Sequence, residues 1–143
     1  MPQGVKKIGH IAFHGLKMSS LKLNDDLERV DQRAFLDTSM PFQIELPQDL
    51  IYIGLEAFCG CGIEGEIVIP EGCVSIGRGA FRGNQITKLT IPSRLEMIED
   101  ETFQSVGRIT EITIPKFVDY IGDRAIAGNA YLFSPFMRKR FIK

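Results

Sequence analysis

A thirteen-residue pattern that occurs six times constrains this chain more than any other feature. Its clearest copy runs from Ile69 to Phe81 and reads IPEGCVSIGRGAF. The second position of the pattern is a proline column, in which Asn24 is the one exception and the other members are Pro2, Pro47, Pro70, Pro92 and Pro115. Consecutive members lie 22 or 23 residues apart. This period predicts a solenoid, because each unit can bury its apolar residues only against neighbouring copies.

Apolar side chains recur at fixed distances after the proline position. The third residue after it is Val5, Leu27, Leu50, Cys73, Leu95 or Val118, and the sixth is Ile8, Val30, Ile53, Ile76, Ile98 or Ile121. The eleventh is Phe13, Phe35, Phe58, Phe81, Phe103 or Ile126, and a small residue precedes it in each copy. We expect these columns to stack into one continuous interior. Glycine recurs at the seventh residue, but Asp31 and Glu99 replace it in two copies, which indicates that this column does not need a positive φ.

Polar and apolar residues alternate just before five of the six proline positions, at residues 20–23, 43–46, 66–69, 88–91 and 111–114. Alternation with a period of two predicts strands with one face inside and one in water. We therefore expect one parallel sheet. Its outward residues form a candidate binding face, which comprises Gln43, Glu45, Glu66, Val68, Lys88, Thr90, Glu111 and Thr113. This face lacks Trp, Tyr and Arg, which anchor many tight interfaces.

The two ends of the chain depart from the regular pattern of residues 20–128. Residues 1–19 form an incomplete first unit, which leaves Leu21, Lys22 and Leu23 as a candidate open edge of the sheet. An uncovered edge pairs readily with another chain. Either the chain is a piece of a longer array, or this edge meets a partner, including a second copy. Residues 129–143 combine Phe136 and Phe141 with basic residues and form either a C-terminal cap or a basic arm; we favour the cap of a single 1–143 domain.

No pattern in the sequence predicts catalysis or a cofactor. The net charge is −1, which gives no reason to expect a nucleic-acid partner, and no apolar run is long enough to span a membrane. His10 and His14 have no accompanying carboxylate motif, and we interpret them as surface or packing residues. Cys59, Cys61 and Cys73 make a poor zinc set without a nearby histidine, so we interpret them as structural. We expect no enzyme, no metal site and no cofactor.

The six copies resemble the BspA-type leucine-rich repeat family, whose unit reads approximately as a strand, Ile-Pro, a valine and then Ser-Ile-Gly-x-x-Ala-Phe. The resemblance covers residues 1 to about 128, and it departs from the family pattern at Asn24, Asp31, Glu99, Thr102 and Ile126. It implies an α/β leucine-rich-repeat solenoid that is right-handed and β-rich, with one parallel sheet and short 3₁₀ or α turns on the opposite side.

The resemblance also implies a non-enzymatic role in binding. The expected function is an interaction or adhesion scaffold for a protein or glycan partner; the alternative is a structural block that stacks end to end. Family members are mostly surface proteins, so the resemblance implies a cell-surface or secreted location. The first residues already belong to the repeat and do not resemble a secretory signal. This observation favours either an intracellular protein or a mature fragment, and the location stays open here.

Overall fold

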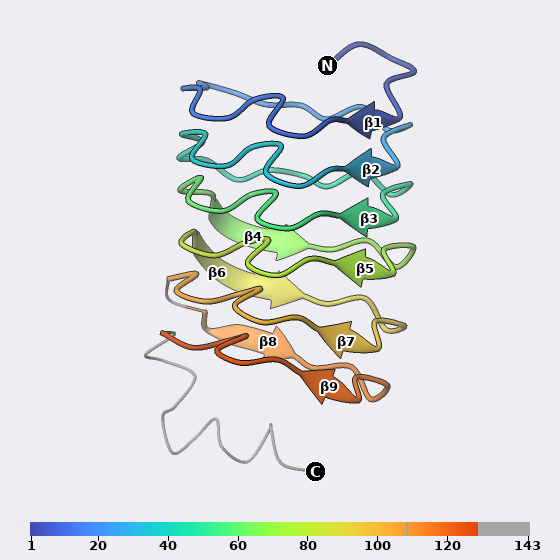
Figure 1. Cartoon of the computed structure of the whole chain (residues 1–143), viewed down its shortest axis with the longest axis vertical. Helices are drawn as coiled ribbons and strands as arrows, with labels where there is room; N and C mark the ends of the chain where they lie inside the picture. The colour runs from blue at the N-terminus through green and yellow to red at the C-terminus, as the bar shows by residue number, and fades with distance from the viewer. Residues whose placement is uncertain (108, 129–143) are drawn as a thin grey trace.

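The computed structural model describes residues 1–107 and 109–128, and these form a solenoid of flat coils stacked in chain order (Figure 1). Each sequence repeat makes one coil. We number the coils by repeat, so that coil 1 is residues 1–19, coil 2 is 20–42, coil 3 is 43–65, coil 4 is 66–87, coil 5 is 88–110 and coil 6 begins at residue 111. The predicted cap at residues 129–143 lies outside the described residues.

Short strands line one side of the solenoid, five and six residues after each proline position (Figure 1). They are β1 (Lys7–Ile8), β2 (Arg29–Val30), β3 (Tyr52–Ile53) and β5 (Ser75–Ile76), which form one parallel sheet, and β7 (Met97–Ile98) and β9 (Tyr120–Ile121), which pair separately. Equivalent residues pair, so that Ile8 lies beside Val30 and Val30 beside Ile53. We did not predict these strands, because two residues are too few to show an alternating pattern.

The predicted sheet forms in three coils instead of five. Its strands are β4 (Glu64–Val68), β6 (Gln85–Thr90) and β8 (Glu111–Thr113), all parallel. The predicted register is confirmed, because Glu66 pairs with Lys88 and Lys88 with Glu111. Residues 20–23 and 43–46 form no strand. The prediction of a single sheet was therefore wrong, since the described coils carry parallel strands at two places.

The expected 3₁₀ or α turns are also wrong, because the described residues contain no helix. In every coil the ninth and thirteenth residues after the proline position have a positive φ. In coil 2 these are Arg33 (φ 56°) and Asp37 (φ 54°), and in coil 3 they are Glu56 (φ 50°) and Gly60 (φ 68°). A residue in the left-handed region interrupts a right-handed helix. The handedness of the whole solenoid stays a prediction.

Backbone N–H groups of these turns bond to the next coil. The amide of Phe58 donates to the carbonyl of Ala80 at 2.8 Å, and Glu56 donates to Arg78 at 2.9 Å. The glycine column makes the close approach of coils possible without a positive φ, as expected. A Cβ at Gly77 would lie 2.5 Å from the backbone nitrogen of Leu55, a separation that real Cβ atoms do not adopt.

The predicted aromatic column forms a continuous spine through the core. Successive rings from Phe13 to Phe103 stack with centroids 5.0, 5.1, 5.4 and 5.8 Å apart. The four later rings, those of Phe35, Phe58, Phe81 and Phe103, are fully buried. The apolar columns around the spine are buried in the inner coils, so the column assignment is confirmed.

Replacing Phe81 with alanine tests this core. We expect the free energy of unfolding to fall by roughly 3–5 kcal/mol, because the change deletes a buried ring that stacks on both sides. Lys88→Ala on the exposed face is the control and should change it by less than about 0.5 kcal/mol. Urea unfolding followed by circular dichroism measures both. Equal loss of stability in the two variants would contradict the assignment of the spine.

Candidate functional site

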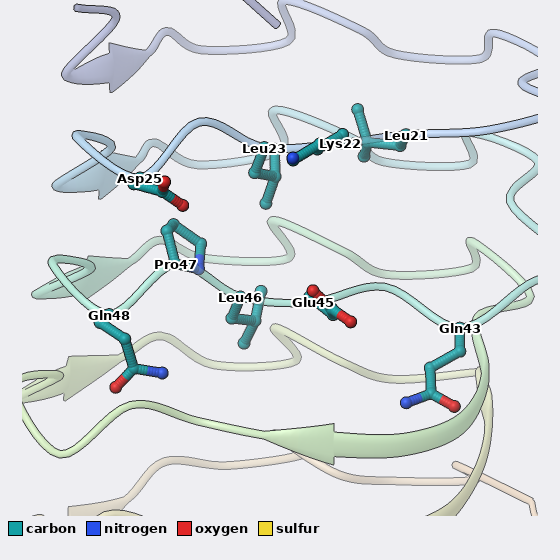
Figure 2. Close-up of a pocket in the computed structure, with 9 residues that line it drawn as sticks. All are labelled: Leu21, Lys22, Leu23, Asp25, Gln43, Glu45, Leu46, Pro47 and Gln48. Carbon is teal, nitrogen blue, oxygen red and sulfur yellow. The ribbon is translucent and has the colours of Figure 1, made fainter. Parts of the chain in front are cut away.

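A cleft between coils 2 and 3 brings together residues that we predicted for two different sites. It has a volume of about 500 Å³ and is lined by Leu21, Lys22, Leu23, Asp25, Gln43, Glu45, Leu46, Pro47 and Gln48. Figure 2 shows the coil 2 segment running alongside the coil 3 segment, with Lys22 and Glu45 between the two ends of the cleft. The candidate edge and the first two residues of the candidate face thus line one surface.

The cleft exists because the coil 2 segment is tied to coil 1. The ammonium group of Met1 donates to the carbonyl of Lys22 at 3.0 Å, and the amide of Gly4 donates to Asp26 at 3.1 Å. Asn24, which replaces proline here, donates through Nδ2 to the carbonyl of Val5 at 2.8 Å. These bonds join residues 22–26 to the coil before them, and the described residues show no equivalent bonds from this segment to residues 43–48.

The coil 3 segment is also poor in backbone hydrogen bonds. Coils 2 and 3 are joined at the end of the turns, where Met40 donates to the carbonyl of Cys61 at 2.8 Å, and again where Ile51 donates to the carbonyl of Glu28 at 2.9 Å. Between those points, no amide of residues 43–46 donates to a described residue. Pro41 and Pro47 bracket this segment, and neither has an N–H to contribute to a ladder.

Charged side chains of both signs border the cleft. Lys22 and Glu45 are exposed, and within the described coils neither takes part in an ion pair. Leu23 and Leu46 are buried and form an apolar floor. Unpaired backbone donors and acceptors favour a ligand that supplies both, such as an extended peptide backbone or the hydroxyl groups of a sugar.

The remaining residues of the predicted face lie on the β4–β6–β8 sheet, away from the cleft. Lys88 Nζ lies 3.4 Å from Glu66 Oε1, and both side chains are about 40% exposed, at 43% and 39%. Exposed pairs of this kind contribute little to stability. The other members are Val68, Thr90, Glu111 and Thr113, and each is exposed.

The candidate edge does not lie at the edge of the sheet. Among the described strands that edge is β4, and Leu21, Lys22 and Leu23 belong to the unpaired segment of coil 2. Sequence reasoning also missed four lining residues, which are Asp25, Leu46, Pro47 and Gln48. They stand at or beside the proline column, to which we assigned no binding role.

A row of arginines and glutamates crosses the turns of coils 2 to 6. Glu101 is buried, and its carboxylate contacts Arg78 at 3.1 Å, Arg82 at 2.6 Å and Arg124 at 2.8 Å. The hydrogen bond from Arg78, together with Arg82 and Arg124, holds the pKa of Glu101 below its usual value. Because the contacts join coils 4, 5 and 6, we interpret Glu101 as a structural clamp.

The cysteines form hydrogen bonds to backbone carbonyls or fill the core. Cys61 Sγ donates to the carbonyl of Phe35 at 2.9 Å, and Asn84, at the same position one coil later, donates to the carbonyl of Phe58 at 2.8 Å. Burial raises the pKa of Cys61 to about 12 and that of Cys73 to about 11. These values support the structural interpretation, because a reactive cysteine needs an accessible thiolate.

Two other classes of site are absent from the described coils. Across residues 1–107 and 109–128 no three His, Cys, Asp or Glu side chains are grouped so as to hold a metal ion. Over the same residues, no helix has the length and hydropathy needed to cross a membrane. His10 and His14 are both exposed on the turns of coil 1.

Amide hydrogen exchange tests the unpaired segment of the cleft. We expect the amides of Ile44 and Leu46 to exchange much faster than that of Leu89, although all three side chains are buried, because only Leu89 lies in a strand paired on both sides. Exchange followed by NMR at single-residue resolution measures this difference. Protection of Ile44 equal to that of Leu89 would mean that coils 2 and 3 are bonded here.

Glu101→Gln tests the clamp through its pH dependence. A carboxylate whose pKa is lowered by folding stabilises the folded state above its unfolded pKa, about 4.3, and this contribution is lost as the pH falls through the folded value. We therefore expect the variant to melt below the wild type at pH 7 and the gap to narrow below about pH 4. Calorimetry across this range provides the measurement. A gap that does not change with pH would contradict the charge-based account.

The comparisons with known proteins agree with the observed fold. A family model described as a BspA-type leucine-rich repeat region matches residues 1–42 and 41–134, in six copies. The crystal structure of a leucine-rich repeat protein from Bacteroides ovatus is similar, with a TM-score of 0.73 and 29% sequence identity over 89% of this chain. The match covers 33% of that protein, so this chain spans about a third of its length. No curated protein matches.

Proposed function

The chain belongs to the BspA-type leucine-rich repeat family, and on this premise we propose that it is a non-enzymatic scaffold that binds an extended segment of a protein partner in the cleft between coils 2 and 3. Repeat proteins of this kind present long, regular surfaces for interaction. The observation that carries the proposal is the interruption of backbone pairing at residues 43–46, beside a cleft of about 500 Å³.

Backbone recognition gives the proposed contact its affinity. An extended peptide can exchange hydrogen bonds with a chain segment that lacks a neighbour, while side-chain positions add specificity. In this cleft Lys22 and Glu45 would select charged side chains, and the buried Leu23 and Leu46 would contact apolar ones. The exposed row from Glu66 to Glu111 lies on the β4–β6–β8 sheet, outside this proposed contact.

The polar groups of the cleft would also accept a carbohydrate. A glycan ligand is the competing occupant, and the test below separates the two. We place the protein at the cell surface or outside the cell, a proposal that rests on the family alone. The absence of catalytic chemistry in the proposal rests on the same ground.

End-to-end stacking is the alternative function, and one observation favours it. Coil 1 carries exposed apolar side chains, with Ile11 53% and Leu16 47% exposed. A shallow apolar hollow lies beside them and is lined by residues that include Val5, Ala12 and Phe13. A stacking partner would cover this surface. Sedimentation that shows concentration-dependent association, abolished by Ile11→Lys, would support assembly in place of binding.

A parallel selection tests the proposed binding function. The full chain is panned against a displayed library of random linear peptides and applied to a glycan array. We expect peptide binders whose affinity falls about tenfold or more in the double variant Lys22→Ala/Glu45→Ala. The matched control, Lys88→Ala/Glu111→Ala, changes one cation and one anion on the sheet and should reduce affinity by less than about threefold.

Two results would contradict the proposal. Peptide binders that are insensitive to the cleft variant would place the site elsewhere. Glycan binders that lose affinity in the cleft variant, without any peptide binder, would make carbohydrate the ligand. Melting temperatures of both variants are measured alongside, and they should match the wild type because all four side chains are at least partly exposed.

A further inference from the structure

The short-strand side of the solenoid presents the anchor residues that the predicted face lacks. Its outward row follows the strand register, and its members are Lys7, Arg29, Tyr52, Ser75, Met97 and Tyr120. The guanidinium of Arg29 lies 4.0 Å from the centre of the Tyr52 ring. Tyrosine, arginine and methionine are enriched where interfaces are tightest. We did not predict this row from the sequence, because we did not predict the short strands.

Large apolar side chains are exposed along this side in coils 3 to 6. We call them the apolar strip; its members, with their exposed fractions, are Ile51 (41%), Val74 (66%), Met97 (44%), Phe117 (72%) and Tyr120 (48%). The strip contains two bonded pairs, because Val74 donates its amide to the carbonyl of Ile51 and Met97 pairs with Tyr120. Five exposed large hydrophobic side chains on consecutive coils form a patch of the kind that marks interaction sites.

Carboxylates border the strip at coils 5 and 6. Glu96 and Asp119 precede Met97 and Tyr120 in sequence, and Glu99, Asp100 and Asp123 follow them. No ion pair joins any of these five carboxylates to a cation among the described residues. In coils 1 and 2, by contrast, charges are paired, with Lys6 Nζ 2.9 Å from Glu28 and Lys7 Nζ 2.8 Å from Asp31.

Two further features indicate a negative field at this end of the strip. The charges of Asp100, Asp123 and Glu99, with desolvation, raise the pKa of the Tyr120 hydroxyl. A hollow beside the strip is lined by Arg94, Glu96, Phe117 and Asp119. Its acidic residues come from two successive coils, so an incoming cation would contact both. Arg94 is the single cation in this lining, against two carboxylates.

We propose that the apolar strip docks a basic amphipathic segment of a partner protein. Apolar side chains of the segment cover Val74, Met97 and Tyr120, and its lysine or arginine side chains reach Glu96 and Asp119 in the hollow. Charge complementarity selects the sign of the partner, because the carboxylates at this end of the strip form no ion pair with a described residue. The strip itself supplies the apolar area that the partner covers. This site is separate from the cleft, so the proposal does not depend on the proposed function.

Fluorescence anisotropy with synthetic peptides tests this inference on the full chain. The probe is a labelled amphipathic peptide of about 18 residues with leucines on one face and lysines on the other. Its matched partner has glutamate at every lysine position. We expect the lysine peptide to bind, its affinity to fall with added salt, and the glutamate peptide to bind at least about tenfold more weakly.

Three double variants assign the binding to the strip. Met97→Ser/Tyr120→Ser removes exposed apolar surface, and Glu96→Gln/Asp119→Asn removes charge; each should weaken binding of the lysine peptide about tenfold or more. Glu66→Gln/Glu111→Gln removes the same charge from the other sheet and should weaken it by less than about threefold. All six residues are at least partly exposed, so the fold should tolerate each change.

Several results would overturn the inference. They are an absence of binding, equal binding of the two peptides, or a control variant that weakens binding as much as Glu96→Gln/Asp119→Asn, which would indicate a non-specific response to net charge. The cleft variant Lys22→Ala/Glu45→Ala is measured in the same assay. If it abolishes peptide binding while Met97→Ser/Tyr120→Ser does not, the lysine peptide binds the cleft, and the strip proposal is wrong while the cleft proposal stands.

Discussion

Hydrogen bonds between successive coils are the interaction on which the rest of the structure depends. On the turn side, amides at the ninth, eleventh and thirteenth residues after the proline position donate to the next coil; in coil 3 these are Glu56, Phe58 and Gly60. The intervening amides close turns within their own coil, as Ala57 does with Gly54. The ninth and thirteenth residues have a positive φ, as Glu56 and Gly60 do in coil 3. The period of 22 or 23 residues follows, because residues at equivalent positions of successive coils must lie side by side to form these bonds.

Both candidate interaction surfaces follow from the way in which the coils stack. Asn24 binds coil 1 and leaves the cleft open towards coil 3. On the short-strand side the stacking places side chains of different coils in one row, so that Met97 and Tyr120 lie together. Charges that meet opposite charges on the next coil form structural pairs, as Glu101 does with its arginines. The carboxylates of coils 5 and 6 beside the strip form no ion pair with a described residue.

The columns and their register could be predicted from the sequence because stacking converts periodicity directly into contact. Phe58 and Phe81 are 23 residues apart in sequence and stack with centroids 5.4 Å apart. The turn conformation could not be predicted in this way. Residues as different as Arg33, Glu56 and Gly79 share a positive φ, so side-chain identity carries no signal for it. The cleft was missed because it depends on which neighbour Asn24 binds, and the strip because its strands contain only two residues.

Scalar couplings through hydrogen bonds, measured by NMR between amide nitrogen and carbonyl carbon, test the central claim most directly. The account predicts a coupling from the amide of Phe58 to the carbonyl of Ala80, and from that of Phe35 to that of Ala57, each joining adjacent coils. A coupling from either amide to a carbonyl three or four residues earlier in its own coil would indicate a helical turn. That result would contradict the account, because the coils would then lack the bonds that align them.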